Sequence, residues 1–455
     1  MKSLSLKEKL IYATGNMGVG LMMAMHMLFL VYFFFPSNVA RLPYLIPQGS
    51  LFMGLTLLGI ILFTSRIFDA ITDPLIASLS DRSRFKSGKR IPFMRIAAIP
   101  MALSYVLVFF VPVLTGITTL NVIWFSFFMF ISVIFITMYT IPYYTLIVDM
   151  AHTSEEKVDL GTYSSAFWFA GFLLASMASS LWEPLELGLT ISRVESIRFS
   201  FVIIGIIASI CMLVPALLIN ESNYETSTTT QKVSFTKAIK TVSKNKSFLA
   251  FLIGNVVYNV ATYIFETGLL YFITVLALLN EEVQGPLTTI IGVLTLLSYP
   301  FVNKFAKRFG KKPIMLIGFV LFAFSFIVVT AFGLWGVNPY YLLIVLAVLV
   351  PFSQAAFGIL PTVMTADCAA YDKRIRNEEN SGMYVAAMSF SSKLGGSIAT
   401  ILFTSLLILG KDVGNDFGIR AATILAAVLS MIGFIIMLGY DEKKILNESE
   451  MAKGE

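Results

Sequence analysis

The chain has 455 residues, of which 57% are hydrophobic and only 13% are charged, and it contains 40 phenylalanines. Soluble domains carry about 25% charged residues, so this composition excludes an ordinary soluble enzyme and indicates an integral membrane protein. The formal net charge is +6. A basic excess is typical of nucleic-acid-binding proteins but also of cytoplasmic membrane loops, and the positions of the charges decide between these two.

Apolar stretches of about 20 residues, the length that crosses the ~30 Å hydrocarbon core of a bilayer, recur along almost the whole chain. Hydropathy and breaker residues predict an all-α protein with twelve transmembrane helices. The first helix follows three lysines and has no small-residue cleavage site after it, so we expect it to be retained. The predicted helices span residues 10–35, 51–79, 91–114, 119–148, 160–182, 199–219, 247–277, 286–303, 312–334, 339–365, 380–409 and 418–440.

Lysine and arginine predict the orientation. With the N-terminus inside, the cytoplasmic segments hold 25 of the 33 basic residues and the outer loops hold five. Arg66, Arg95 and Lys393 fall within or at the ends of helices. This asymmetry predicts that both termini are cytoplasmic and that the protein lies in the plasma membrane, the inner membrane in a bacterium. It also explains the basic excess without nucleic acid.

The longest polar stretch between helices divides them six and six, and several motifs recur in both halves. Gly88–Pro92 resembles Gly310–Pro313, and their prolines lie 221 residues apart; Pro142 and Pro361 lie 219 residues apart. Two agreeing offsets indicate a duplication. We therefore expect two pseudo-symmetric six-helix bundles around a midplane site, the architecture of the major facilitator fold. The expected domains are an N-terminal bundle (1–219), a cytoplasmic linker (220–246), a C-terminal bundle (247–440) and a cytoplasmic tail (441–455).

Charged residues inside the second predicted helix need a reason, since a charge at the bilayer centre costs at least ~2.5 kcal/mol. Asp69 and Asp73 are four residues apart, and Arg66 precedes Asp69 by three, so all three share one helical face. Two such carboxylates must share a proton, pair with a base or hold a cation. With the hydroxyl of Thr72 they offer the oxygen ligands that Na⁺ prefers. The alternative is a structural ion pair between Arg66 and one aspartate.

The eleventh and seventh predicted helices carry further one-sided polar stripes. Lys393 lies midway along the eleventh helix between Ser389 and Ser397, and we expect it to have a partner there. In the seventh helix polar residues recur at steps of three and four, which indicates a face toward a watery cavity, where Glu266 could be a second proton or cation site, or amides that hold helices together. This second stripe comprises Asn255, Asn259, Thr262 or Tyr263, and Glu266.

Enzymatic chemistry has no support in the sequence. There is no phosphate-binding glycine-rich loop with lysine, so ATP-driven pumping lacks its motif. There is neither a His/Cys metal cluster nor a nucleophile elbow. We therefore expect no enzyme activity, no ATP and no cofactor beyond a coupling ion, Na⁺ or H⁺.

The second helix and its following loop resemble the glycoside, pentoside and hexuronide cation symporters, which include the bacterial melibiose carrier and a vertebrate lysolipid symporter. The most specific motifs are Arg66–Pro74, Gly88–Pro92, Ile141-Pro142 and Lys393–Ser397. The resemblance implies that Asp69 and Asp73 bind the cation and that Thr137, on the fourth helix, assists them. It also places Lys393 near the cation and sugar sites.

The sequence departs from the sugar carrier at several of its ligand positions. Thr72 stands where the carrier has asparagine. Gly20 and Thr140 align with the acids that grip the sugar, and Ser164 aligns with its fifth-helix arginine. The galactoside grip is therefore absent.

These observations predict a secondary active transporter that couples Na⁺ or H⁺ to the symport of a small organic solute, with a sugar or glycoside-like compound as the expected solute. The alternatives are a symporter of lysolipids or other amphiphiles and a non-pumping scramblase or membrane sensor. Arg66 and Lys393 are the expected charge partners of the aspartates. The partners are the solute and membrane lipid, and a monomer is expected. Substrate-cavity candidates are Asn16, Gly20, Thr140, Tyr143, Ser164, Trp168, Asn255, Asn259, Tyr263, Glu266 and Ser389, and the basic loops expected to gate the cytoplasmic side contain Asp81, Arg82, Gly88, Lys89, Arg90, Lys311 and Lys312.

Overall fold

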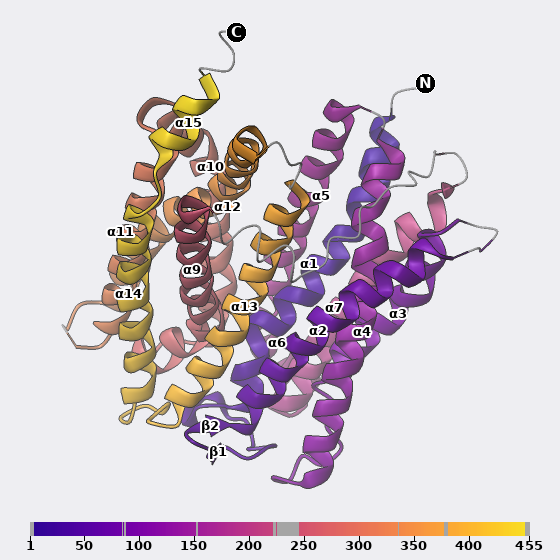
Figure 1. The fold of residues 1–455 in the computed structure, drawn as a ribbon. Coiled ribbons are helices and arrows are strands. Elements are labelled where there is room, and N and C mark those ends of the chain that lie inside the picture. The colour runs from indigo at the N-terminus through magenta and orange to yellow at the C-terminus, as the bar shows by residue number, and fades with distance from the viewer. Residues whose placement is uncertain are drawn as a thin grey trace. The chain divides into compact units, whose positions relative to one another are not determined.

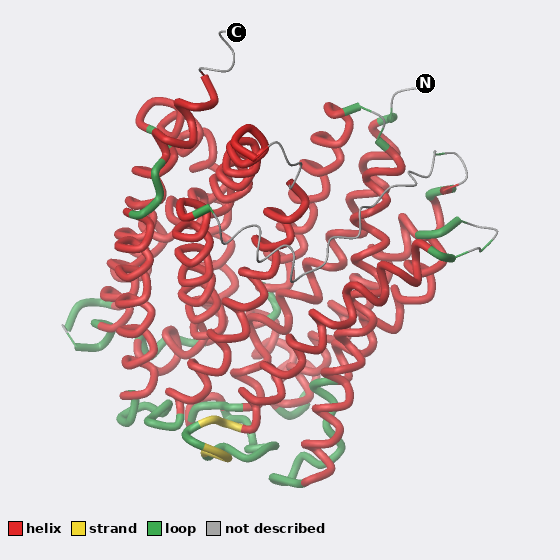
Figure 2. Tube along the Cα trace, viewed as in Figure 1, coloured by secondary structure: helices red, strands yellow, loops and turns green. Residues whose placement is uncertain are grey.

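The structure, a computed structural model, describes residues 4–83, 85, 88–151, 153–221, 224, 245–334, 336–376 and 381–450. Helices make up most of this part of the chain (Figure 1). Strand is confined, within the described residues, to a short hairpin between the first two helices (Figure 2). Backbone contacts divide the chain into two units, Met1–Thr230 with Leu279–Pro286 and Gln231–Leu278 with Leu287–Glu455.

The first unit contains six long helices, the shorter α6 and the hairpin. Its elements are α1 (Leu6–Phe34), a 3-10 turn (Asn38–Ala40), β1 (Ser50–Phe52), β2 (Leu55–Thr56), α2 (Leu57–Asp81), α3 (Ile91–Leu107), α4 (Thr119–Met150), α5 (Ser154–Ser176), α6 (Ser179–Leu189) and α7 (Arg193–Leu218). The 3-10 turn Glu281–Val283 also belongs to it.

The second unit is built from the remaining helices. These are α9 (Lys246–Tyr271), a π-helical turn (Phe272–Leu276), α10 (Gln284–Phe309), α11 (Lys311–Thr330), α12 (Pro339–Arg376), α13 (Ser381–Leu407), α14 (Phe417–Leu438) and the short α15 (Glu442–Glu450). Most of the expected linker 220–246 falls outside the described residues, so its boundaries stay a prediction.

The same helix pairs are in contact in each unit. In the first unit α1 packs against α5 and α7, and α3 packs against α4 and α7. In the second, α9 packs against α13 and α14, and α11 packs against α12 and α14. When the long helices of each unit are numbered in chain order, the first packs against the fifth and sixth in both units, and the third packs against the fourth and sixth. This repeated pattern agrees with the duplication that the motif offsets indicate.

The helix predicted over 51–79 is wrong at its start. Residues 50–56 form the hairpin, with Ser50 paired to Thr56 and Phe52 paired to Leu55. Met53 and Gly54 connect the strands with φ of 47° and 82°, and two positive values suit the two-residue turns that match strand twist. The helix begins only at Leu57, where the Thr56 side chain accepts a hydrogen bond from the Gly59 N–H.

Several further predicted helices differ from the structure in their ends: the helix predicted over 91–114 ends at Leu107, and the one predicted over 339–365 continues to Arg376. The span predicted over 160–182 begins at Ser154, breaks after Ser176 and continues as α6, bent by 42°. The helix predicted over 199–219 begins at Arg193, because Ser192 and Glu195 form a capping box. Arg193 and Arg198, expected in an outer loop, therefore lie in the first turns of α7.

Nine helices of the described chain are long and apolar enough to cross a membrane, or ten if the bent pair α5 and α6 is one span. Helix α3 has 17 residues and is too short to be counted among them. Helix α2 is not counted either, because every stretch of 18 residues within it contains the three charged residues Arg66, Asp69 and Asp73. The chain is thus an integral membrane protein, whereas the count of twelve spans remains a prediction.

Helix α1 is almost completely enclosed in its unit, and glycines let α5 approach it closely. A Cβ atom added to Gly20 would lie 2.1 Å from the Trp168 carbonyl oxygen, and one added to Gly171 would lie 2.2 Å from that of Met17. Both distances are too short for non-bonded atoms, so neither Gly20 nor Gly171 could be replaced by a residue with a side chain without moving the backbone. Glycine at these positions is therefore required by backbone contact, as in other small-residue membrane interfaces.

Replacing Gly171 by alanine should lower the melting temperature of the detergent-purified protein. The added methyl would force α1 and α5 apart, and overpacking of this kind costs about 1–3 kcal/mol. Gly161→Ala on the same helix is the matched control, since a Cβ there meets nothing within 4 Å. The control should be neutral or slightly stabilising. Equal melting curves for the two variants would contradict the close contact of α1 with α5.

Candidate functional site

Helix α2 is polar on its buried face and apolar on its exposed face. Asp69 and Thr72 are buried, with Asp69 only 7% exposed, whereas Ile67, Ile71 and Leu75 are exposed. Soluble helices show the opposite arrangement. The exposed face fits lipid, and the carboxylate faces the interior of the helix unit, where intramembrane charges are found when they have a function.

Asp69 and Asp73 are brought together by a hydroxyl from α4. The Thr137 Oγ1 lies 3.0 Å from Asp69 Oδ1 and 3.3 Å from Asp73 Oδ1, and Thr137 is buried. A single hydroxyl can donate its one proton to only one of these carboxylates at a time. Three side-chain oxygens from two helices therefore converge on one place in the first unit.

Two features of α2 add oxygen atoms near this convergence. The Thr72 hydroxyl donates to the Asp69 carbonyl at 3.1 Å and keeps its own lone pairs. Pro74, inside the helix, has no N–H and leaves the Ala70 carbonyl without its usual intrahelical donor. The cluster can thus accept a proton or a hard monovalent cation with oxygen ligands.

The described residues contain no group of three or more His, Cys, Asp or Glu side chains that could hold a metal ion. Two carboxylates and hydroxyls are a poor match for zinc or iron, which take nitrogen and sulfur ligands readily. Sodium, which was the metal anticipated at Asp69 and Asp73, fits the donor set.

The two expected charge partners lie in different units. Arg66 is partly buried on α2 and interacts electrostatically with His26 of α1. Lys393 is partly buried on α13 of the second unit, between exposed Ser389 and buried Ser397. The Ser397 hydroxyl donates to the Lys393 carbonyl at 2.8 Å, so this serine is engaged within its own helix.

Most cavity candidates of the first unit hold helices together. Asn16 donates to the Ser164 carbonyl at 3.1 Å and accepts from the Tyr144 hydroxyl at 3.1 Å. The Tyr143 hydroxyl donates to the Tyr12 carbonyl at 2.8 Å, and the two rings stack at 4.3 Å. These contacts join α1, α4 and α5 into one polar network.

The other three positions in this unit have local explanations. Gly20 lies against the backbone at Trp168. The Thr140 hydroxyl donates to the Ile136 carbonyl of its own helix at 2.8 Å. The Trp168 ring stacks on Phe172 at 5.6 Å. Within the described contacts, packing therefore accounts for these residues.

The polar stripe of α9 meets two different neighbours in the second unit. Asn255 donates to the Ser391 hydroxyl of α13 at 3.0 Å, and Asn259 donates to the Asn255 carbonyl at 2.7 Å. Farther along, Gln354 of α12 donates to Glu266 at 3.3 Å. Tyr263 lies against Gly396 of α13. Gln354 was missed by sequence reasoning, although it is the one amide side chain of α12.

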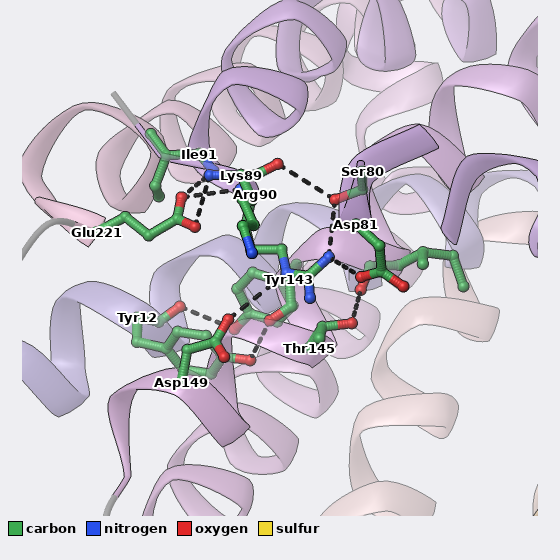
Figure 3. A network of polar contacts seen from close by, with 11 residues as sticks. Tyr12, Ser80, Asp81, Lys89, Arg90, Ile91, Tyr143, Thr145, Asp149 and Glu221 are labelled. Atoms are coloured by element: carbon green, nitrogen blue, oxygen red, sulfur yellow. Dashed lines mark hydrogen bonds and ion pairs between the residues drawn. The ribbon is translucent and has the colours of Figure 1, made fainter. Parts of the chain in front are cut away.

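The loop between α2 and α3 is organised by a glutamate that the sequence did not single out. Glu221, just after α7, accepts hydrogen bonds of 2.7–3.0 Å from the backbone N–H groups of Lys89, Arg90 and Ile91 (Figure 3). It thereby satisfies donors at the start of α3, where a negative charge is favoured. Gly88 precedes them with φ of 112°, and a Cβ there would collide with Glu221.

Arg90 joins the same loop to α2 and α4. Its guanidinium lies 2.5 Å from Asp81 and 3.5 Å from the buried Asp149 (Figure 3). It also donates to the Ser80 hydroxyl at 3.1 Å. Arg82 and Lys89 contribute no side-chain contact of this kind that the structure describes. Of the basic residues of this loop that the structure describes, Arg90 is thus the one whose side chain forms ion pairs.

The second unit repeats this arrangement. Glu442, which follows α14 and lies 221 residues after Glu221, accepts from the N–H groups of Lys311 and Lys312 at 2.7 and 2.9 Å. Gly310 precedes them with φ of 95°. The Lys311 ammonium pairs with Asp367 of α12 as Arg90 pairs with Asp149 of α4. Both basic loops therefore have the same structural role in their own units.

Glu221→Ala should lower the melting temperature, because three backbone donors lose a charged acceptor. Bonds to charged groups contribute about 1.5–3 kcal/mol, and we expect a total loss of about 1–3 kcal/mol once water replaces the carboxylate. Glu442→Ala should cost less, since two donors are affected. Exposed Glu183 serves as the control, because Glu183→Ala should change stability by less than about 0.5 kcal/mol. Indistinguishable melting of Glu221→Ala and this control would refute the capping role.

Comparison with known proteins identifies relatives along the whole chain. The family model described as MFS/sugar transport protein matches residues 11–440. An uncharacterized symporter of Bacillus subtilis, YjmB, is 24% identical over 96% of this chain and 93% of its own length. The sodium-dependent lysophosphatidylcholine symporter 1 of Xenopus tropicalis is 24% identical over 75% of this chain and 71% of its own. A lactose permease of Lactobacillus helveticus is 24% identical over 86% and 64%, respectively.

Solved structures of transporters share the fold. The nucleoside transporter NupG superposes with a TM-score of 0.64 at 14% identity, covering 96% of this chain and 98% of NupG. The D-xylose-proton symporter gives 0.60 at 16% identity, with 93% and 96% covered. At these identities the likeness concerns the fold alone.

Proposed function

The chain belongs to the MFS/sugar transport protein family of the major facilitator superfamily, and we propose that it couples an inward cation gradient to the symport of a small organic solute. Its relatives include a lactose permease and a sodium-dependent lysophosphatidylcholine symporter, and a nucleoside transporter shares its fold. The proposal includes the finer architecture expected from the sequence: twelve spans in two six-helix bundles, with both termini cytoplasmic.

The convergence of Asp69, Asp73 and Thr137 is the observation that carries this proposal. Two carboxylates that share one hydroxyl in a buried place repel each other when both are ionised. A bound Na⁺ or a proton removes that repulsion. Cation binding is therefore favourable at this cluster, and its free energy becomes available to bias the protein between conformations.

In the proposed cycle the cation binds first and the solute second. The loaded, less charged site then permits the change of access, because moving a compensated site costs less in a low-dielectric surrounding than moving two bare carboxylates. When the cation leaves, Arg66 and Lys393 are proposed to compensate the aspartates. The loops ordered by Glu221 and Glu442 would gate the cytoplasmic side.

The proposed solute is a sugar or glycoside-like compound, as transported by the lactose permease relative. An amphiphile such as a lysolipid is the second candidate. It is favoured by one observation in the first unit: the side chains of Asn16, Thr140 and Tyr143 already bond to neighbouring protein groups, which leaves fewer polar groups for several sugar hydroxyls. The lysophosphatidylcholine symporter among the relatives points the same way.

Cation binding can be tested without knowing the solute. Replacing choline chloride by NaCl at equal ionic strength should raise the melting temperature of the detergent-purified protein, because a ligand bound by the native state stabilises it by mass action. Asp73→Asn should abolish the Na⁺-dependent increase. Asp441→Asn is the control, since Asn keeps the helix cap that Asp441 forms with the Lys444 N–H. If Na⁺ has no effect, a lower pH should stabilise the wild type instead and identify the proton.

Coupling itself is tested in proteoliposomes. An imposed inward Na⁺ or H⁺ gradient should concentrate solutes from a panel of sugars, uronides and lysolipids, and the Asp69→Ala, Asp73→Ala double variant should allow at most downhill movement. Uphill uptake by the double variant would rule out the proposed site. Downhill movement alone in the wild type would instead support the non-pumping scramblase.

A further inference from the structure

A second buried carboxyl lies in the second unit, away from the aspartate pair in sequence and on a different set of helices. Glu266 is on α9 and is only 8% exposed. Its neighbours along the helix, Phe265 and Leu269, are buried apolar residues. Helix α9 with its π-helical turn spans residues 246–276 and is long and apolar enough to cross a membrane. Glu266 is therefore a carboxyl surrounded by protein inside a transmembrane helix.

The hydrogen-bonding partners of Glu266 are neutral. The Gln354 amide of α12 donates to Glu266 Oε1 at 3.3 Å. The carbonyl oxygen of the same amide lies 3.2 Å from the Thr295 hydroxyl of α10, whose single proton can go either to this oxygen or to the Ile291 carbonyl at 2.8 Å. A polar chain thus runs across three helices and ends at the carboxyl, in a unit whose remaining interior is largely apolar.

In the part of the second unit that the structure describes, this carboxyl has no ion pair. Among the described residues, no lysine or arginine forms an ion pair with Glu266, and the basic groups with known contacts are used elsewhere: Lys311 pairs with Asp367 and Arg420 pairs with Asp416. The titratable group that interacts with it electrostatically is Tyr258 of its own helix, which is neutral at physiological pH. Among the contacts that the structure describes, α12 contributes the Gln354 amide and α10 the Thr295 hydroxyl beyond it, and α13 and α14, which also pack against α9, contribute no polar or charged partner of Glu266.

An ionised carboxylate without a cation is strongly unfavourable in such a place. A proton on Oε2 removes the charge and leaves Oε1 free to accept the Gln354 bond, which the geometry already provides. The carboxyl also retains acceptor capacity beyond this single bond. We propose that Glu266 is a proton-binding site of the second unit, separate from the cation site at Asp69 and Asp73.

This site would make the protein sensitive to pH even if Na⁺ is the coupling ion. Deprotonation of Glu266 places a charge in the α9–α12 contact, and the resulting electrostatic cost would favour a conformation in which water reaches the carboxyl. A proton bound in one conformation and released in another would then contribute to the driving force or regulate it.

Infrared difference spectroscopy of the detergent-purified protein tests the proton directly. The wild type should show a carbonyl stretch of a protonated carboxylic acid at neutral pH that disappears at alkaline pH. Glu266→Gln should remove this band while preserving the size and hydrogen-bonding shape of the side chain. Glu282→Gln, which changes an exposed glutamate outside the helices, should leave it intact.

Two further variants make the result unambiguous. Gln354→Leu removes the amide donor and should move the acid band to higher wavenumber, which assigns the band even if Glu266→Gln does not fold. The Asp69→Asn, Asp73→Asn double variant should keep the band, so that loss of cation coupling and loss of this site are distinguished. The proposal is overturned if Glu266→Gln removes intensity from the carboxylate region at neutral pH, or if neither variant at 266 or 354 changes the acid band.

Discussion

The cost of an uncompensated charge in hydrocarbon is the constraint on which the rest of this structure depends. It explains why α2 turns Asp69 and Thr72 inward while Ile67 and Ile71 remain exposed, an arrangement that would be unstable in water. It also explains why Thr137, from another helix, lies between the two aspartates. A chain that tolerates such a site must neutralise it, and a transported cation is a neutralising agent whose concentration differs across the membrane.

The same constraint acts at the ends of the helices, where backbone donors rather than side-chain charges need partners. Glu221 and Glu442 supply them in the two units, each after the last long helix of its unit and each beside a glycine with positive φ. Near these glycines, Arg90 pairs with Asp149 of α4 and Lys311 pairs with Asp367 of α12. The two units therefore share this set of contacts, which agrees with the duplication that the motif offsets indicate.

Hydropathy and charge predicted the membrane helices and the aspartate pair, because both depend on local sequence. Neither predicted the hairpin. Its residues Leu51, Phe52 and Met53 are as apolar as those of a membrane helix, but the chain turns at Met53 and Gly54. The partners of Asp69 and Glu266 could not be derived from spacing: Thr137 came from family resemblance, and Gln354 was overlooked, since both come from helices far along the chain. The role of Glu221 could not be predicted for the same reason, because its hydrogen-bond donors are backbone N–H groups of a distant loop.

The contact of α1 with α5 has a consequence for how a solute reaches the protein. Gly20 and Gly171 bring the two backbones so close that no side chain separates them at these positions. Sliding one helix along the other would bring backbone atoms at these positions into collision. Helices α1 and α5 are therefore expected to move together, and a lateral opening in the first unit is expected between another pair of helices.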